Sequence, residues 1–360
     1  MSGPTKIEWA DSSWNPVTGC SKVSAGCAHC YAERMAKRLA GRGGYPKENP
    51  FAVTLHPERL DEPLRWRKPR RIFVCSMSDL FHPGVPVGFI DNVFAVMRIA
   101  RQHCFQVLTK RPDRMAAYLS SGSGVFADDP KPERRDDIGV TAFAMTECDN
   151  DLVQPEDWPL PNIWLGSSIE DQATADERIP HLLRCPAAMR FVSYEPALGP
   201  VNFTRIDYTK RLVEELTAFV RGRGRDPDKE IVGYGPGTAW INALSGECSD
   251  GEDYGKEKAR LDWLIAGGES CPGARPAHPD WFRSVRDQCQ AAGVPFFFKG
   301  WGEWVVPNST VREMDFVPKF KVGRQHLFDD GPIACRLGKK AAGRLLDGVE
   351  HNAYPGEART

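Results

Sequence analysis

The chain has 360 residues, of which 41% are hydrophobic, so it can bury a large core in one domain or two. Its 47 basic and 48 acidic residues give a net charge of -1, which excludes the global polybasic character that drives nonspecific binding to nucleic acid. No apolar run reaches the roughly 20 residues that cross a bilayer, and the first residues lack the order of a secretory signal. We therefore expect a cytoplasmic protein without a membrane partner.

Short apolar segments alternate with amphipathic segments along most of the chain. The pattern predicts helices at 31–40, 87–102, 112–120, 173–184 and 278–292. It predicts strands at 72–75, 105–109, 162–168, 189–193, 261–268 and 294–298, with one more before Cys20. Such alternation is typical of parallel β/α units with right-handed crossovers. The prediction is an α/β fold, a full or partial parallel β/α barrel, with a doubly wound open sheet as the alternative.

Two polar stretches interrupt this alternation. Residues 121–158 and 204–258 are rich in glycine, proline and charge, and we interpret them as insertions between barrel units or as a substrate lid. The barrel is predicted to span 1–304 with these two insertions. Residues 305–360 show no clear period and form a predicted C-terminal extension.

Polar side chains follow every predicted strand, where the loops of a parallel barrel build the active site. They include Ser76, Ser78, Asp79, His82, Lys110, Arg111, Glu170, Glu195, Glu269, Lys299, Trp301 and Trp304. A hydrolase that uses Glu170, Glu195 or Glu269 is one interpretation, but no motif supports it. The two tryptophans fit a base-stacking role and a core role equally well.

Three of the eleven cysteines are clustered: Cys20, Cys27 and Cys30, followed at once by Tyr31. Three thiols cannot all form disulfides with one another, so the spacing C-x6-C-x2-C indicates a metal or a cluster. If the metal is zinc, His29 is the nearest fourth ligand, although its adjacency to Cys30 makes joint coordination awkward. If it is an iron–sulfur cluster, one iron stays open to another molecule.

The motifs together resemble those of a known superfamily. A three-cysteine loop at the start of a β/α barrel, with an aromatic residue after the last cysteine, is similar to radical S-adenosylmethionine (SAM) enzymes. The closer resemblance is to a three-Cys-motif family of phages and prophages that is related to them. Its landmarks in residues 9–304 are WNPVTGCSKVSAGCAHCYAERMA, CSMSDLFH, LTKRP, WLGSSIED, FVSYEPALGP, AGGES and FFFKGWGEW.

The resemblance implies a 4Fe-4S cluster on Cys20, Cys27 and Cys30, SAM on the open iron, and a reducing electron donor. Tyr31 would lie near the adenine, and Ser78 and Asp79 would contact SAM. The chain departs from the superfamily in two respects. Six residues separate the first two cysteines where three are usual, and a Gly-Gly-Glu motif occurs only late, at 267–269.

The substrate is less constrained by the sequence. Basic residues interleaved with aromatics, as in 65–71, at Lys110, Arg111 and Arg114, and at Arg221, Arg223 and Arg225, suit phosphate contact and base stacking. The resemblance implies a modified nucleobase in phage DNA, in the host cytoplasm, for example isomerisation of an N-linked glycyl-thymidine to a C-linked one; a free nucleotide is the simpler substrate. The alternative function is a zinc-stabilised, non-enzymatic protein that binds nucleic acid or a partner.

Overall fold

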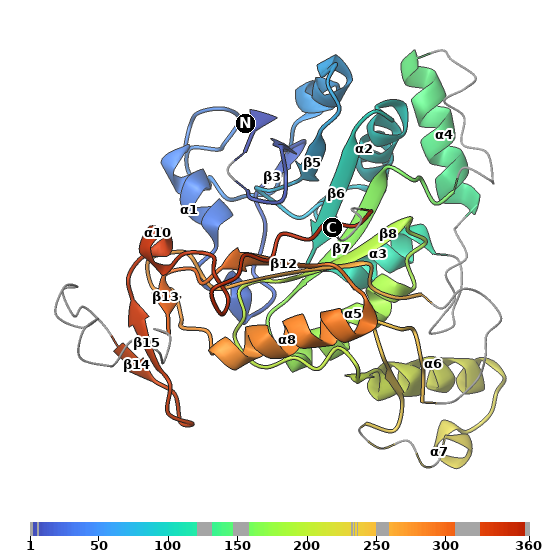
Figure 1. The fold of residues 1–360 in the computed structure, drawn as a ribbon. Helices are drawn as coiled ribbons and strands as arrows, with labels where there is room; N and C mark the ends of the chain where they lie inside the picture. The colour runs from blue at the N-terminus through green and yellow to red at the C-terminus, as the bar shows by residue number, and fades with distance from the viewer. Residues whose placement is uncertain are drawn as a thin grey trace.

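The computed structural model describes residues 3–5, 7–120, 132–146, 158–231, 233, 235, 237–249, 259–306 and 325–356. Its centre is an eight-stranded sheet in the order β1-β2-β5-β6-β7-β8-β11-β12. All neighbouring strands from β2 onwards are parallel, and the two-residue β1 pairs antiparallel with β2 at one edge. The seven parallel strands curl into a half-barrel, which confirms the predicted fold class (Figure 1).

The strands are short and apolar. Their bounds are β1 Gly3–Pro4, β2 Ser12–Trp14, β5 Arg71–Val74, β6 Cys104–Thr109, β7 Ile163–Ile169, β8 Met189–Tyr194, β11 Trp263–Gly267 and β12 Phe296–Gly300. Each predicted strand is present to within about two residues, as expected for boundaries read from sequence. The last strand begins two residues later than predicted and runs on to Gly300, which pairs with Gly267 of β11.

Helices connect the parallel strands. They are α1 Tyr31–Arg38, α2 Val87–Ile99, α3 Pro112–Leu119, α5 Gln172–Leu183 and α8 Pro279–Ala292. Two of their ends are set by local sequence. Asp171 caps α5 by accepting from the Thr174 N–H at 2.9 Å. Gly293 ends α8 in the left-handed conformation, at φ 71°. No helix in the described ranges is long and apolar enough to cross a membrane.

The concave face of the half-barrel is filled by aromatic rings. Phe191, Trp263 and Phe297 from three strands pack with Trp9 from the N-terminal segment and Tyr354 from the C-terminal segment. We call these five residues the aromatic floor. Trp263 Nε1 donates to Ala353 O at 2.9 Å, and Tyr354 Oη donates to Glu8 O at 3.2 Å. Both ends of the chain therefore close the floor, and the space above it lies toward the carboxyl ends of the strands.

Helices also occur in the two polar stretches. The first contains α4 Pro132–Thr146, and the second contains β9 Ile206–Asp207, α6 Thr209–Gly222, α7 Pro227–Glu230 and β10 Trp240–Ile241. Residues 121–131, 147–157 and 250–258 of these stretches lie outside the described residues. In the C-terminal extension, β13 Trp304–Val305, β14 Gln325–Leu327 and β15 Ile333–Arg336 form a small sheet, followed by α10 Lys339–Ala342. The first polar stretch lies between β6 and β7 and the second between β8 and β11, so each one connects two strands that are neighbours in the sheet.

Candidate functional site

A small two-stranded antiparallel sheet fixes the position at which the cysteine loop begins. Strands β3 Val17–Thr18 and β4 Thr54–Leu55 pair antiparallel, and Cys20 N donates to Phe51 O at 3.2 Å. Gly19 between them has φ 82°, and a Cβ there would overlap the Ala52 carbonyl. Only glycine suits this left-handed, close-packed position. The backbone that runs from the carboxyl end of β2 to Cys20 therefore has one defined conformation.

The other two cysteines precede the first helix. Cys27 ends the short 3-10 helix η1 Ala25–Cys27, and Cys30 is the residue before α1. All three cysteines are free thiols of intermediate exposure. Tyr31, the first residue of α1, is 59% exposed.

A buried carboxylate anchors the middle of the loop. Glu170 follows β7, is fully buried, and accepts a hydrogen bond from Ser24 Oγ at 2.8 Å. Lys110 and Arg178 form ion pairs with it, the latter at 3.2 Å. A Cβ on Gly26 would stand 2.6 Å from Glu170 Cγ, so the loop backbone lies directly on this carboxylate. Two cations and one anion thus meet beneath the loop, where Glu170 and Arg178 are buried and Lys110 is partly exposed.

A buried arginine anchors the start of the loop. Arg111, which follows β6, donates to Cys20 Sγ at 3.5 Å and to Ser21 O at 3.0 Å. Its Nη1 also lies 2.9 Å from Asp79 Oδ2. Asp79 accepts further bonds from Thr109 Oγ1 at 2.7 Å and from Lys110 N at 3.1 Å. The Asp79 carboxylate therefore orients Arg111, and Arg111 orients Cys20.

A third contact comes from the far side of the sheet. Arg275, in the loop after β11, pairs with Glu269 at 2.7 Å and donates to Ala25 O at 3.0 Å. In the same loop, a Cβ on Gly273 would stand 2.8 Å from the His29 ring. The cysteine loop is thus held against residues that follow β5, β6, β7 and β11, all at the carboxyl edge of the half-barrel.

The surroundings act differently on two of the thiols. Burial and the nearby Asp79 charge raise the pKa of Cys20, although Arg111 opposes them. Burial would also raise the pKa of Cys27, but the Lys110 charge and the hydrogen bonds of Val23 and Ser24 outweigh it and lower the pKa. Cationic neighbours of this kind favour the thiolate, which is the form that binds metal.

The three cysteine thiolates are soft donors, which suit a zinc ion or an iron–sulfur cluster. Two thiolates on one zinc ion stand about 3.8 Å apart, given a Zn–S distance near 2.3 Å and tetrahedral angles. Among the described residues, the only group of three ligand atoms within 4.8 Å of one another is His278, Asp280 and Asp330, so the three sulfurs are not gathered that tightly. A cluster interposes several atoms between its thiolates and accepts the wider spacing.

Several predicted site residues have internal partners. Ser78 Oγ donates to Val17 O at 2.8 Å, and Asp79 is only 5% exposed with both oxygens bonded. A direct contact of either residue with SAM stays a prediction. Trp301 and Trp304 are buried, and their indole N–H groups donate to Leu345 O at 2.8 Å and to Ala274 O at 2.6 Å. The core interpretation of these two tryptophans is the one that their contacts support.

The remaining polar residues divide between the site and other surfaces. Glu195 and Lys299, at the ends of β8 and β12, form an ion pair at 2.6 Å. Burial would lower the pKa of Lys299, but Glu195 outweighs it and raises the pKa. Arg114 donates to the His82 and Val85 carbonyls. The basic stretch 65–71 leads into β5, whose first residue is Arg71, so it lies at the amino end of this strand and not at the carboxyl end.

Sequence reasoning missed Arg178, Arg275 and Gly26. Arg178 lies inside α5, where a helical arginine is ordinarily on the surface, yet it is 3% exposed. Arg275 belongs to a loop without a recognisable motif. Gly26 is one of 33 glycines. A signal existed only for Arg178, which lies eight residues after Glu170 on the buried side of α5, between Ala175 and Ile179.

Comparison with known proteins gives a family and a set of solved structures. Residues 4–355 match the family described as "Protein of unknown function (DUF5131)". No curated protein matches the chain. Three solved chains match: two point mutants of spore photoproduct lyase and spore photoproduct lyase complexed with dinucleoside spore photoproduct. They are 10%, 10% and 9% identical, with TM-scores of 0.34, 0.33 and 0.32, and each match covers 95% of this chain and 72% of the other.

Proposed function

We propose that this chain, which belongs to the DUF5131 family of proteins of unknown function, is a radical SAM enzyme. In this proposal Cys20, Cys27 and Cys30 hold a 4Fe-4S cluster whose open iron binds SAM. One observation carries the proposal. A loop with three free thiols is anchored over the carboxyl edge of a parallel half-barrel by side chains from four strand ends.

The bound group would supply a 5′-deoxyadenosyl radical, which abstracts hydrogen from an unactivated C–H bond. The residues of the chain orient and shield it. Arg111 holds the start of the loop at Cys20, and the bond from Ser24 to Glu170 holds the stretch between Cys20 and Cys27. The aromatic floor excludes water from below, because its rings fill the concave face. Tyr31 offers an exposed ring beside Cys30 for the adenine.

Polar groups at the mouth suit a polar substrate. Glu195 and Lys299 line a small hollow with room for about one water molecule, which Lys339 and Arg344 also line. A nucleobase or nucleotide offers amide edges and phosphate to such groups. Within this proposal, the substrate is a modified nucleobase in phage DNA, and one example of the reaction is conversion of an N-linked into a C-linked glycyl-thymidine. A base inside a duplex would have to flip out to reach the site.

The decisive experiment is anaerobic reconstitution of the full-length protein with iron and sulfide. We expect a brown protein with cluster absorbance that releases 5′-deoxyadenosine when dithionite and SAM are added. The variant Cys27→Ala should lose both the iron and the product. Cys248→Ala is the matched control, because it removes a partly exposed thiol outside the loop.

Two outcomes would end the proposal. A folded protein that takes up no iron contradicts the cluster. Stoichiometric zinc that depends on the three cysteines, with no 5′-deoxyadenosine, supports the zinc-stabilised binding protein instead. The substrate is tested separately. The reconstituted enzyme is incubated with N-linked glycyl-thymidine, either as a free nucleotide or within an oligonucleotide, and the product is followed by liquid chromatography with mass spectrometry.

A further inference from the structure

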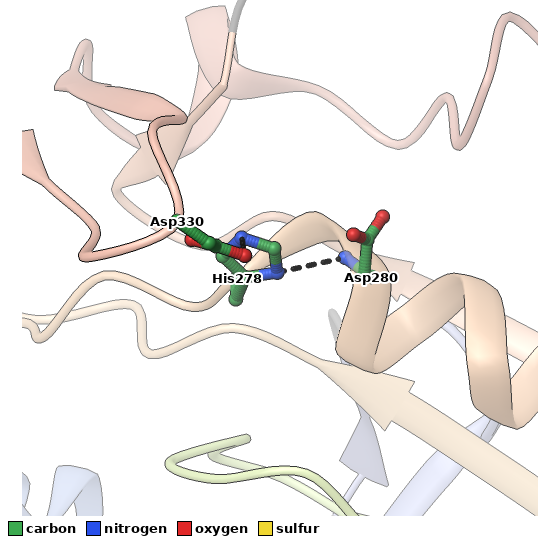
Figure 2. Close-up of side chains that lie close together, drawn as sticks. All are labelled: His278, Asp280 and Asp330. Carbon is green, nitrogen blue, oxygen red and sulfur yellow. Dashed lines mark hydrogen bonds and ion pairs between the residues drawn. The ribbon is translucent and has the colours of Figure 1, made fainter.

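A second group of metal-binding side chains lies away from the cysteines. His278 precedes α8, Asp280 is in its first turn, and Asp330 lies in the turn between β14 and β15. The ligand atoms of these three residues all lie within 4.8 Å of one another. Figure 2 shows the imidazole between the two segments, with Asp330 on the C-terminal hairpin and Asp280 on the helix.

The imidazole supplies the observation that points to a ligand. His278 is 5% exposed, and its Nε2 has no hydrogen-bond partner. Asp330 Oδ2 nevertheless lies 3.1 Å from Nε2, so the two atoms are close without being aligned as donor and acceptor. Two ligand atoms on one zinc ion stand about 2.9–3.4 Å apart, given bonds of 2.0–2.1 Å. The pair therefore has the spacing of two ligands that share an ion.

The surroundings hold the ring in this position. Phe328 packs edge-on against the imidazole with centroids 4.7 Å apart, and Trp281 lies on another side at 6.0 Å. Nδ1 accepts from Asp280 N at 3.2 Å. An ion on Nε2 would require the neutral ring's proton on Nδ1, so metal binding would replace the hydrogen bond that Nδ1 accepts from Asp280 N. Asp280 Oδ1 also accepts from Arg283, which leaves the second carboxylate oxygen for the ion.

We propose that His278, Asp280 and Asp330 form a site for a divalent transition-metal ion, for which Zn²⁺ is the probe, with water in the remaining positions. One imidazole and two carboxylates are a ligand set that such ions accept. The ion joins the β14–β15 hairpin to the first turn of α8. The loop before α8 carries Arg275 and Gly273, which touch the cysteine loop, so the ion steadies one wall of the candidate site.

The test uses the full chain carrying Cys20→Ser, Cys27→Ser and Cys30→Ser, so that the cysteine loop cannot bind the probe. Zn²⁺ is titrated by calorimetry, and amide hydrogen exchange is followed for residues 325–336. We expect one stoichiometric binding event and slower exchange of the hairpin when Zn²⁺ is present. Asp330→Asn should weaken binding by more than about tenfold and remove the protection.

The control is Asp329→Asn, which removes the same charge one residue away on the same exposed turn and should bind Zn²⁺ as the parent does. His278→Gln should also abolish binding, but His278 caps α8 and its replacement can disturb the helix start. Asp330 is exposed, so Asp330→Asn tests the site without that defect. Equal affinity in Asp330→Asn and Asp329→Asn overturns the proposal. So does a hairpin whose exchange is the same with and without Zn²⁺. Because the cysteines are replaced, either result leaves the proposed cluster untouched.

Discussion

At the scale of single residues, the site depends on charges that are buried in opposite pairs. Arg111 and Asp79 are 8% and 5% exposed, and Glu170 with Arg178 is buried more deeply. Such pairs contribute little net stability, but removing one partner leaves an uncompensated charge without water. Substitutions at these residues therefore test the loop's anchoring more sharply than surface changes would.

Arg111→Met should lower the free energy of unfolding of the cluster-free protein by about 3 kcal/mol, because Asp79 loses its charged partner. It should also lower the iron bound after reconstitution, since Cys20 loses its hydrogen bond and Ser21 its clamp. Urea unfolding and iron analysis measure the two effects. Arg65→Met is the control, because Arg65 is an exposed partner of Asp61 and its loss should change either value little. Normal iron in a folded Arg111→Met protein would contradict the anchoring role.

Gly26→Ala should destabilise the protein by about 1–3 kcal/mol, the usual cost of extra atoms in a packed interior. The new methyl group meets the Glu170 side chain, which Lys110 and Arg178 prevent from moving aside. Gly88→Ala is the matched control. Gly88 lies in α2 with open space where the Cβ would go, so alanine there should be neutral or stabilising. Thermal and urea unfolding of both variants compare the costs.

At the scale of elements, the start of α5 places Glu170. Asp171 accepts from the Thr174 N–H at 2.9 Å, and Thr174 Oγ1 accepts in return from Asp171 N at 3.0 Å. The same hydroxyl oxygen accepts from Glu170 N at 2.9 Å. This capping box therefore sets the direction of the residue that carries the buried carboxylate.

Asp171→Ala should cost about 1 kcal/mol of stability through the lost cap, whereas Asp171→Asn should retain most of it. If the cap positions Glu170, the alanine variant should also show faster amide exchange in the cysteine loop, at residues 21–28. Hydrogen exchange by mass spectrometry resolves that segment. Exchange that changes only inside α5 would confine the role of the cap to the helix.

The sequence supports prediction of the elements better than of their contacts. The strands and five helices were predictable because apolar runs and helical periodicity are local properties. α6 was missed because its amphipathic stretch, 209–222, adjoins the polar segment RGRGRDPDKE, whose composition dominated the interpretation of the insertion. α4 was missed for a similar reason, since its polar start follows a Gly- and Pro-rich segment.

The site was predictable only in part. The cysteines and the strand-end positions of Lys110, Arg111 and Glu170 follow from motif spacing and from the rule that parallel strands present their carboxyl ends to one edge. Which of these residues pair with each other is a tertiary property. Lys110 and Arg111 form ion pairs with Glu170 and Asp79, which follow neighbouring strands, and a contact of either basic residue with phosphate stays a prediction. No local pattern records that adjacency.

At the scale of the whole molecule, charge pairs join the C-terminal segment to the barrel. Asp347 accepts from Arg283 and Arg286 of α8 at 2.7 Å each. These hydrogen bonds hold the pKa of Asp347 at about 2, below its ordinary value of 3.8. A carboxylate with a lowered folded-state pKa stabilises the protein fully above its unfolded pKa, and this contribution is lost as the pH falls through the folded pKa.

Asp347→Asn should therefore lower stability at pH 7, and the difference from the parent should narrow as the pH falls from about 5 to about 3. Asparagine tolerates the positive φ of 53° at this position, so the backbone does not confound the comparison. Urea midpoints of both proteins across this range measure the effect. A difference that stays constant with pH would show that Asp347 acts through packing and not through its charge.

The closure of the aromatic floor by both chain ends has a consequence for synthesis. The hydrogen bond from Tyr354 to Glu8 joins residues 346 positions apart, so this contact forms only after residue 354 has left the ribosome. Contacts so distant in sequence slow folding, and chains of this size pass through partly folded states. The cysteine loop is made early, whereas the strand ends that cover it come later. During translation its thiols are thus uncovered, and the proposed cluster would be loaded after these later residues have folded over the loop.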